Sequence, residues 1–369
     1  MKLVNRHLAA ASIVVAALAL AACSSSPSTA TGTTAPAETT GAATSEASAT
    51  AAACASISPF EFQLQQPPNG SNAGFAAGVE EGFYKNHCLD VKIIAGTGSS
   101  TTAQMVASGK ANIGYADSAA TTQLIAKGAP LVVVGTILQS NPNEVIAFKS
   151  SGISSIADLK GKKVGTPIPS SQASMLPLFF AANGLKESDV TLVNIAATSL
   201  TQSLLQHQVD AILGSIDTYQ VQVQAQSTEP LFTAMFADHG VATVSTSIFA
   251  NKDWAAKNAD AVKAFVAGSL EGWAFAAKNP QKSVDDLTTL WGAGEPSKTS
   301  LQELQATLDG NLLCANGAKY LGKATPDAWT KTQDLLSSVG LLDKGVDPTK
   351  YYTYDYLPPD NQLPVCPLS

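Results

Sequence analysis

Few side chains in this chain are of the types that usually take part in catalysis or in charged contacts with a ligand. Asp117 and Asp217 each follow an apolar run, and each has a tyrosine two residues away, Tyr115 and Tyr219. The aspartates could accept hydrogen bonds from amino groups of a heteroaromatic ligand, or they could cap the helices that follow them. The tyrosines could stack on a ligand or pack where two domains meet. The sequence alone leaves both interpretations open.

Catalytic and metal-binding motifs are missing from the sequence. It has no GxSxG, HExxH or P-loop pattern, and it has only four histidines. The segment GTGSS at residues 96–100 is too short and wrongly spaced for a dinucleotide fingerprint. No CxxC or paired-histidine spacing indicates zinc. We therefore expect no enzyme activity, no cofactor and no metal.

The charge balance limits the classes of partner. The net charge is −7, and Arg6 is the only arginine. Nucleic-acid binding needs clustered basic side chains, so we expect no nucleic-acid partner. Beyond residue 6 no guanidinium group can clamp a carboxylate or phosphate with two parallel hydrogen bonds. We therefore expect a dianionic ligand to bind weakly.

The first 53 residues predict export and a membrane anchor. Residues 1–22 combine Lys2 and Arg6 with a short apolar run, which is typical of a signal peptide and too short to span a bilayer comfortably. Leu-Ala-Ala-Cys at residues 20–23 resembles a bacterial lipoprotein signal, which implies that Cys23 carries fatty acyl chains such as palmitate. Residues 23–53 then form a flexible tether of Ser, Thr and Ala. The alternatives are a true transmembrane anchor and an ordinary secreted protein.

The remaining residues predict an α/β fold of two lobes. Predicted strands alternate with helices of about ten residues, which is typical of parallel βαβ units. The alternation restarts near residue 145, so we expect lobe 1 in residues 54–144, lobe 2 in 145–243, and a return to lobe 1 in 244–369. Residues 73–86 are expected to form one helix, and a long helix is expected over residues 255–278. Lobes joined by crossing strands leave a cleft between them, and ligands favour such interfaces.

Four cysteines remain if Cys23 is lipidated, and an exported chain favours disulfides among them. Three pairings are possible. We favour Cys54 with Cys88, since both precede strands that would start at the same edge of a parallel sheet. Cys314 would then pair with Cys366.

Four segments in order resemble the type II solute-binding proteins of ABC importers. They are EEGFYKNHCLDVKII (80–94), VASGKANIGYADS (106–118), IADLKGKKVGTP (156–167) and VDAILGSIDTY (209–219). The branch that they resemble binds nitrate, taurine, alkanesulfonates and thiamine-pyrimidine precursors. PNGSN at residues 68–72 is similar to the Pro-Asn loop of the pyrimidine-precursor binders, although Gln66, Pro67 and Asn72 replace that branch's usual aromatic residues and histidine. The related eukaryotic pyrimidine synthase has a cysteine-rich cluster that this chain lacks.

The resemblance implies a lipid-anchored, monomeric, extracytoplasmic receptor. It would close on a small polar or heteroaromatic molecule and deliver it to permease and ATPase subunits. The alternative is an exported sensor or adhesion protein with a vestigial cleft. In such a fold the ligand lies where strands end and helices begin. The implied binding residues are Asn69, Ser71, Asn72, Thr97, Ser99, Tyr115, Asp117, Ser118, Gln139, Thr166, Ser170, Ser171, Ser215, Asp217 and Tyr219.

Overall fold

Two five-stranded sheets form the framework of the computed structural model, which describes residues 54–292 and 298–368. The predicted signal, the lipidation site Cys23 and the tether lie outside the described residues. The first sheet has the order β2 (Leu89–Ile94), β1 (Ser58–Gln63), β3 (Ile113–Asp117), β10 (Thr246–Asn251), β4 (Leu131–Thr136). The second has the order β7 (Thr191–Asn194), β6 (Lys163–Thr166), β8 (Ala211–Ser215), β5 (Asn143–Phe148), β9 (Leu231–Met235). We call the first sheet with its helices lobe 1 and the second lobe 2.

Each sheet combines parallel and antiparallel strands. In lobe 1, β1 pairs in parallel with β2 and β3, while β10 lies antiparallel between β3 and β4. In lobe 2, β6 pairs in parallel with β7 and β8, while β5 lies antiparallel between β8 and β9. The parallel strands therefore direct their carboxyl ends to one edge of each sheet, and the following loops gather there.

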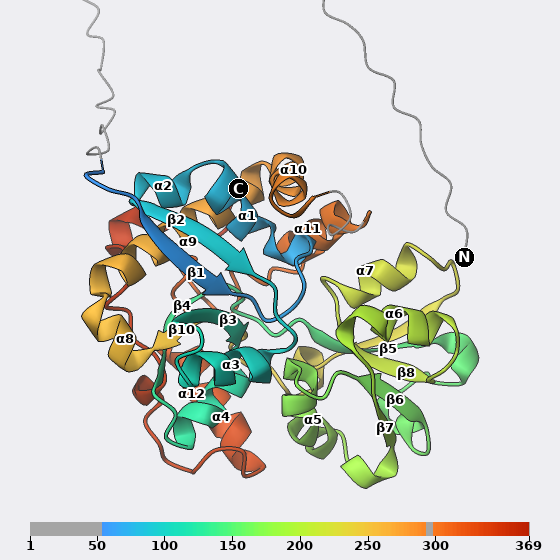
Figure 1. Ribbon diagram of the computed structural model, residues 1–369. Helices are drawn as coiled ribbons and strands as arrows, with labels where there is room; N and C mark the ends of the chain where they lie inside the picture. The colour runs from blue at the N-terminus through green and yellow to red at the C-terminus, as the bar shows by residue number, and fades with distance from the viewer. Residues whose placement is uncertain (1–53, 293–297, 369) are drawn as a thin grey trace, which may run out of the picture. The chain divides into compact units, whose positions relative to one another are not determined.

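Helices cover both sheets (Figure 1). Those of lobe 1 are α1 (Ala73–Glu80), α2 (Phe83–Asn86), α3 (Ser99–Ala107), α4 (Ser118–Ala126), α8 (Lys252–Lys257), α9 (Ala259–Lys278), α10 (Pro280–Trp291), α11 (Ser300–Asp309) and α12 (Pro326–Ser338). Those of lobe 2 are α5 (Ser171–Ala182), α6 (Ala197–Leu205) and α7 (Tyr219–Gln224). The 3₁₀ turns are η1 (Gly70–Asn72), η2 (Lys149–Ser151), η3 (Ile156–Leu159), η4 (Glu187–Asp189), η5 (Ala237–His239), η6 (Pro348–Lys350) and η7 (Asp360–Gln362).

Two helices differ from the sequence prediction. The expected helix over residues 73–86 is two helices, since Gly82 adopts a left-handed conformation (φ 78°) that ends α1 and starts α2. The expected helix over 255–278 is also two, because Asn258 lies between α8 and α9. Neither break moves an element to the other lobe.

Lobe 1 has an aromatic core under the site. The ring centroids of Phe62 and Phe75 lie 4.9 Å apart, and that of Tyr115 lies 4.8 Å from Phe75 in an edge-on arrangement. All three side chains are fully buried. Edge-to-face contacts of this kind stabilise a core beyond the area that they bury. The rings therefore hold the end of β3 firmly against α1.

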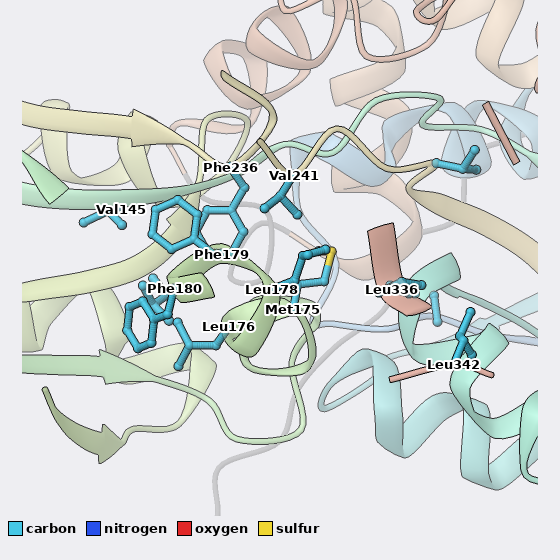
Figure 2. Close-up of a cluster of buried hydrophobic side chains, with 14 of the residues drawn as sticks. Val145, Met175, Leu176, Leu178, Phe179, Phe180, Phe236, Val241, Leu336 and Leu342 are labelled. Atoms are coloured by element: carbon cyan, nitrogen blue, oxygen red, sulfur yellow. The ribbon is translucent and has the colours of Figure 1, made fainter. Parts of the chain in front are cut away.

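A second core joins the lobes behind the site. Figure 2 shows Met175 and Leu178 of α5 lying between the Phe179–Phe236 pair of lobe 2 and Leu336 and Leu342 of lobe 1. Phe179 and Phe236 stack with centroids 4.0 Å apart. This cluster is continuous and apolar, so the two lobes share buried surface at this point.

Two disulfides cross-link lobe 1. Cys54 bonds to Cys88, and Cys314 bonds to Cys366. These are the pairs that the positions of the predicted strands favour. The first joins the segments before β1 and β2, and the second joins the C-terminal tail to the loop after α11.

Candidate binding cleft

A cavity between the two lobes collects the loops at the carboxyl ends of the strands. Its volume is about 60 Å³ for the centres of water-sized atoms, several times the ~10–15 Å³ that one water requires. Its lining residues are Gln65, Gln66, Ser71, Thr97, Gly98, Ser99, Tyr115, Leu138, Pro142, Asn143, Pro167, Ser170, Ser171, Gln172, Ala197, Ser215, Asp217, Tyr219 and Thr246. Both lobes supply polar groups, so the cavity can hold a small polar molecule.

The structure brings most of the expected binding residues to this cavity. Nine of the fifteen line it: Ser71, Thr97, Ser99, Tyr115, Ser170, Ser171, Ser215, Asp217 and Tyr219. Asn69 lines an adjoining cavity, which Tyr219 also borders. Of the two tyrosines, Tyr115 is a buried ring of the lobe 1 core that also lines the cavity.

Asp117 lies beside the cavity but is engaged elsewhere. It is the N-cap of α4, and its carboxylate accepts from the Ala119 N–H at 2.9 Å and from the Ser245 hydroxyl at 3.1 Å. Burial raises its pKa to about 6, and these hydrogen bonds oppose that shift. The side chain fixes the start of α4 and is absent from the cavity lining.

Four other expected residues also lie outside the cavity lining. The Ser118 hydroxyl donates to the Ser245 carbonyl at 2.5 Å. The Gln139 amide donates to the carbonyls of Leu313 and Tyr320 at 3.0 and 2.9 Å. These bonds attach the segment between β4 and β5, which connects lobe 1 to lobe 2, to the C-terminal part of lobe 1. The other two are Thr166 and Asn72, which are fully buried.

The sequence analysis missed five polar lining residues: Gln65, Gln66, Asn143, Gln172 and Thr246. Gln65 and Gln66 follow Leu64, one residue past the end of β1, so their place at the end of a predicted strand was the signal that could have found them. Asn143 is the first residue of β5, directly after the segment that connects β4 to β5, and no local pattern indicates which way its side chain points.

Three lining residues have buried polar atoms that no other described group satisfies. These atoms are Gln65 Oε1, Tyr115 Oη and Asn143 Nδ2. A buried polar atom without a partner costs about 1–3 kcal/mol, so native proteins rarely leave one. Together they offer an acceptor, a hydroxyl and a donor. Burial, assisted by the charges of Asp217 and Asp117, raises the Tyr115 pKa, so the phenol stays neutral.

Asp217 is the only charged residue among the described residues that line the cavity. Burial raises its pKa to about 6, hydrogen bonds from Ser215 and Thr218 oppose this, and the nearby charge of Glu303 adds to it. Asp217 does not cap α7, whose N-cap position is Thr218. It therefore presents an acceptor that is ionised at neutral pH.

A second buried carboxyl lies behind Asp217. Glu144 on β5 is 1% exposed, and burial, with a contribution from the Asp217 charge, raises its pKa to about 8. With its amide nitrogen toward the carboxyl, Gln220 donates to both Glu144 oxygens at 2.8 and 3.1 Å. Glu144 is therefore mostly neutral at pH 7. The site as a whole carries acidic groups and no counter-charge from lysine or arginine in the described lining.

Direct bonds join the lobes across the cleft. The Ser100 N–H donates to the Pro169 carbonyl at 3.1 Å. The Gln222 amide of α7 donates to Glu303 of α11 at 2.9 Å, and the same carboxylate accepts from the Gly70 N–H at 2.8 Å. Glu303 thus links the loop after β1 to lobe 2.

The described part of the chain shows neither a metal-binding cluster nor a membrane-spanning helix. In residues 54–292 and 298–368, no group of three or more His, Cys, Asp or Glu side chains could hold a metal ion. In the same ranges, no helix has both the length and the apolar character needed to cross a bilayer.

Known proteins of similar sequence are named as binding and biosynthetic proteins. The "Putative thiamine biosynthesis protein" of Haemophilus influenzae is 33% identical over 153 residues, which is 42% of this chain and 48% of that protein, so the match spans about half its length. The riboflavin-binding protein RibY of Chloroflexus aurantiacus is 25% identical over 79% of this chain and 84% of its own. A 4-amino-5-hydroxymethyl-2-methylpyrimidine phosphate synthase of Legionella pneumophila is 24% identical over 56% of this chain and 65% of its own. Similar proteins therefore include both binding proteins and a named synthase.

Solved structures share the fold. The periplasmic aliphatic sulphonate-binding protein SsuA of Escherichia coli superposes with a TM-score of 0.60 at 18% identity, covering 82% of this chain and 99% of that one. The fold is thus the two-lobed α/β fold of periplasmic binding proteins, as expected. The model of the family described as "NMT1/THI5 like" matches residues 69–283, more than half of the sequence, and the chain belongs to that family.

Proposed function

We propose that the protein is the extracytoplasmic receptor of an ABC importer and that it binds a small, uncharged nitrogen heterocycle. Thiamine-pyrimidine precursors are the first class to test. The names of two relatives, one for thiamine biosynthesis and one for riboflavin binding, support a heterocyclic ligand. The fold of a sulphonate-binding protein supports the receptor role but does not indicate the ligand.

One observation carries the choice of ligand. Gln65 Oε1, Tyr115 Oη and Asn143 Nδ2 are buried at the cavity without partners, beside the Asp217 carboxyl. An aminopyrimidine carries N–H donors and ring-nitrogen acceptors, which can pair with such a set. A sulfonate or nitrate carries only acceptors, and it would meet the Asp217 charge with no lysine or arginine in the described lining. The polar groups at the cavity therefore favour an uncharged aminopyrimidine over a sulfonate or nitrate anion.

The proposed mechanism is capture by lobe closure. A ligand that contacts both walls binds the closed arrangement better than an open one, and it shifts the population by that difference in affinity. The bonds of Ser100 to Pro169 and of Gln222 to Glu303 would form as the lobes meet. Permease and ATPase subunits would then accept the ligand from the closed receptor.

The experiment is calorimetric titration of residues 54–369 with 4-amino-5-hydroxymethyl-2-methylpyrimidine, methanesulfonate and nitrate. We expect binding of the pyrimidine alone. Asn143→Leu keeps the approximate volume but removes the donor, so affinity should fall roughly tenfold. Asn361→Leu is the matched control, because Asn361 is exposed and remote from the lining. Tighter binding of the two anions would contradict the proposed ligand class.

We also propose that the protein is not an enzyme. The described residues of the cavity lining include the Asp217 carboxyl and the hydroxyls of serine and tyrosine, but no histidine or lysine that could act as a base for those hydroxyls. A bound pyrimidine should be recovered unchanged by mass spectrometry after prolonged incubation. If no ligand of the panel binds and native mass spectrometry finds none, the sensor or adhesion role becomes the better explanation.

The lipid anchor is a separate part of the proposal. Cys23 would be acylated and would hold the protein at the outer face of the membrane. Metabolic labelling with an alkyne analogue of palmitate should mark the wild type and leave Cys23→Ala unlabelled and released to the medium. Retention of Cys23→Ala in the membrane would indicate a different anchor.

A further inference from the structure

A second cavity, which we call the vestibule, opens beside the binding cavity. Its volume is about 300 Å³. The two cavities share three lining residues, Thr97, Pro167 and Ala197, so they are neighbours. A substituent on a molecule in the binding cavity would reach the vestibule by passing these three residues.

The vestibule differs in chemistry from the binding cavity. Apolar side chains from both lobes dominate its wall: Pro67 follows β1 in lobe 1, while Pro169, Ile195 and Ala196 come from lobe 2. The binding cavity instead gathers glutamine, asparagine, serine and aspartate side chains. Water against an apolar wall is displaced favourably by a hydrocarbon group. The pair of cavities therefore suits a molecule with one polar end and one apolar end.

The vestibule wall is held in place by backbone contacts. The Ile168 N–H donates to Asn194 Oδ1 at 3.1 Å, which fixes the loop after β6 against the end of β7. Gly98 packs against Pro169 so closely that a Cβ atom there would lie 2.4 Å from the Pro169 carbonyl oxygen, and its φ of 143° disfavours other residues. A wall that is ordered in this way loses little entropy when a ligand covers it.

We propose that the vestibule is a subsite for an apolar substituent of the ligand, with the polar ring in the binding cavity. This inference rests on the proposed function. It assigns the ligand class more narrowly: a nitrogen heterocycle that carries an uncharged apolar arm of a few carbon atoms. A bare ring would leave the apolar wall of the vestibule in contact with water.

The test is a homologous series of 4-amino-2-methylpyrimidines with hydrogen, methyl, ethyl and propyl at C5, titrated into the wild-type protein. Burial of each added methylene should tighten binding about fourfold, so the propyl compound should bind roughly sixtyfold more tightly than the parent ring. Ala196→Leu should place a bulkier apolar side chain in the space proposed for the arm and flatten this dependence while it keeps the affinity for the parent ring, since Ala196 does not line the binding cavity. Ile57→Ser removes an exposed apolar group elsewhere and is the control.

The outcomes separate the two proposals. If the parent ring binds but longer arms bring no gain, or if Ala196→Leu leaves the gain intact, the subsite is wrong and the receptor function stands. If no member of the series binds, the heterocycle assignment fails, and the subsite assignment fails with it. A gain that persists in Ile57→Ser and vanishes in Ala196→Leu is the expected result.

Discussion

Replacing Glu144 with glutamine should make the stability of the protein less dependent on pH between pH 5 and pH 7. In the folded protein the pKa of this carboxyl is about 8, while an unburied glutamate has 4.5. Between these values the folded state holds one proton that the unfolded state has released. The free energy of unfolding therefore falls as pH rises, by about 1.4 kcal/mol per pH unit for this group.

The expected change in the free energy of unfolding can be given for the interval from pH 5 to pH 7, which lies between the unfolded and folded pKa values of Glu144. From pH 5 to pH 7 the unfolded carboxyl is ionised and the folded one is mostly protonated, so Glu144 alone should lower the free energy of unfolding by roughly 2–3 kcal/mol. Glu144→Gln cannot ionise, and its amide can still pair with Gln220. The variant should lose that much less stability over the same interval.

The assay is urea-induced unfolding at pH 5, 6 and 7 for the wild type, Glu144→Gln and the exposed control Glu187→Gln. Other buried carboxyls, including those of Asp117 and Asp217, titrate in all three proteins, so the difference between the curves isolates one residue. The control should follow the wild type within about 0.5 kcal/mol. Parallel curves for the wild type and Glu144→Gln would contradict this prediction, because they would mean that the buried carboxyl titrates normally.

Three further predictions concern the cleft and the cross-links. If Asp217 accepts from the ligand as a carboxylate, affinity measured by calorimetry should rise up to tenfold from pH 5 to pH 7, and Asp217→Asn should abolish that rise. Gln222→Leu removes the cross-cleft bond to Glu303 and should speed ligand dissociation about tenfold in stopped-flow measurements, whereas an unchanged rate would exclude a role in closure. Replacing Cys314 and Cys366 together by alanine should lower the free energy of unfolding by about 2–4 kcal/mol in chemical denaturation, and a loss below 1 kcal/mol would contradict this.

The sequence predicted the architecture better than it predicted individual contacts. Strands such as Leu89–Ile94 and Ala211–Ser215 were evident because runs of apolar residues stand between polar loops. The break at Gly82 was missed, since a glycine inside a helical pattern is compatible with both a continuous helix and a helix end. Helix and strand periodicity fixes the type of an element but not the point at which it stops.

The site was predictable to the level of loops and not of side chains. Asp117 ends β3 and Asp217 follows β8 by two residues, yet the first caps α4 and the second lines the cavity. What separates them is tertiary: Ser245, which lies 128 residues away in sequence, donates to Asp117. Asn143 was missed for the same reason, because its Oδ1 accepts from the Ser171 hydroxyl at 3.3 Å, 28 residues away in sequence. A partner that is far away in sequence cannot be recognised from the residues that surround either position.

The strand order has a consequence for how the chain folds during synthesis and export. All five strands of lobe 2 lie between residues 143 and 235, whereas the first sheet needs β10, at residues 246–251, to bridge β3 and β4. When the chain emerges with its N-terminus first, every strand of lobe 2 is therefore available before β10 can join β3 to β4 in the sheet of lobe 1. Until then, β3 and β4 present unpaired edges that can associate with other chains. Within lobe 1, early folding depends on the β1–β2 pair and its nearby disulfide, and closure of the Cys314–Cys366 bond must come last.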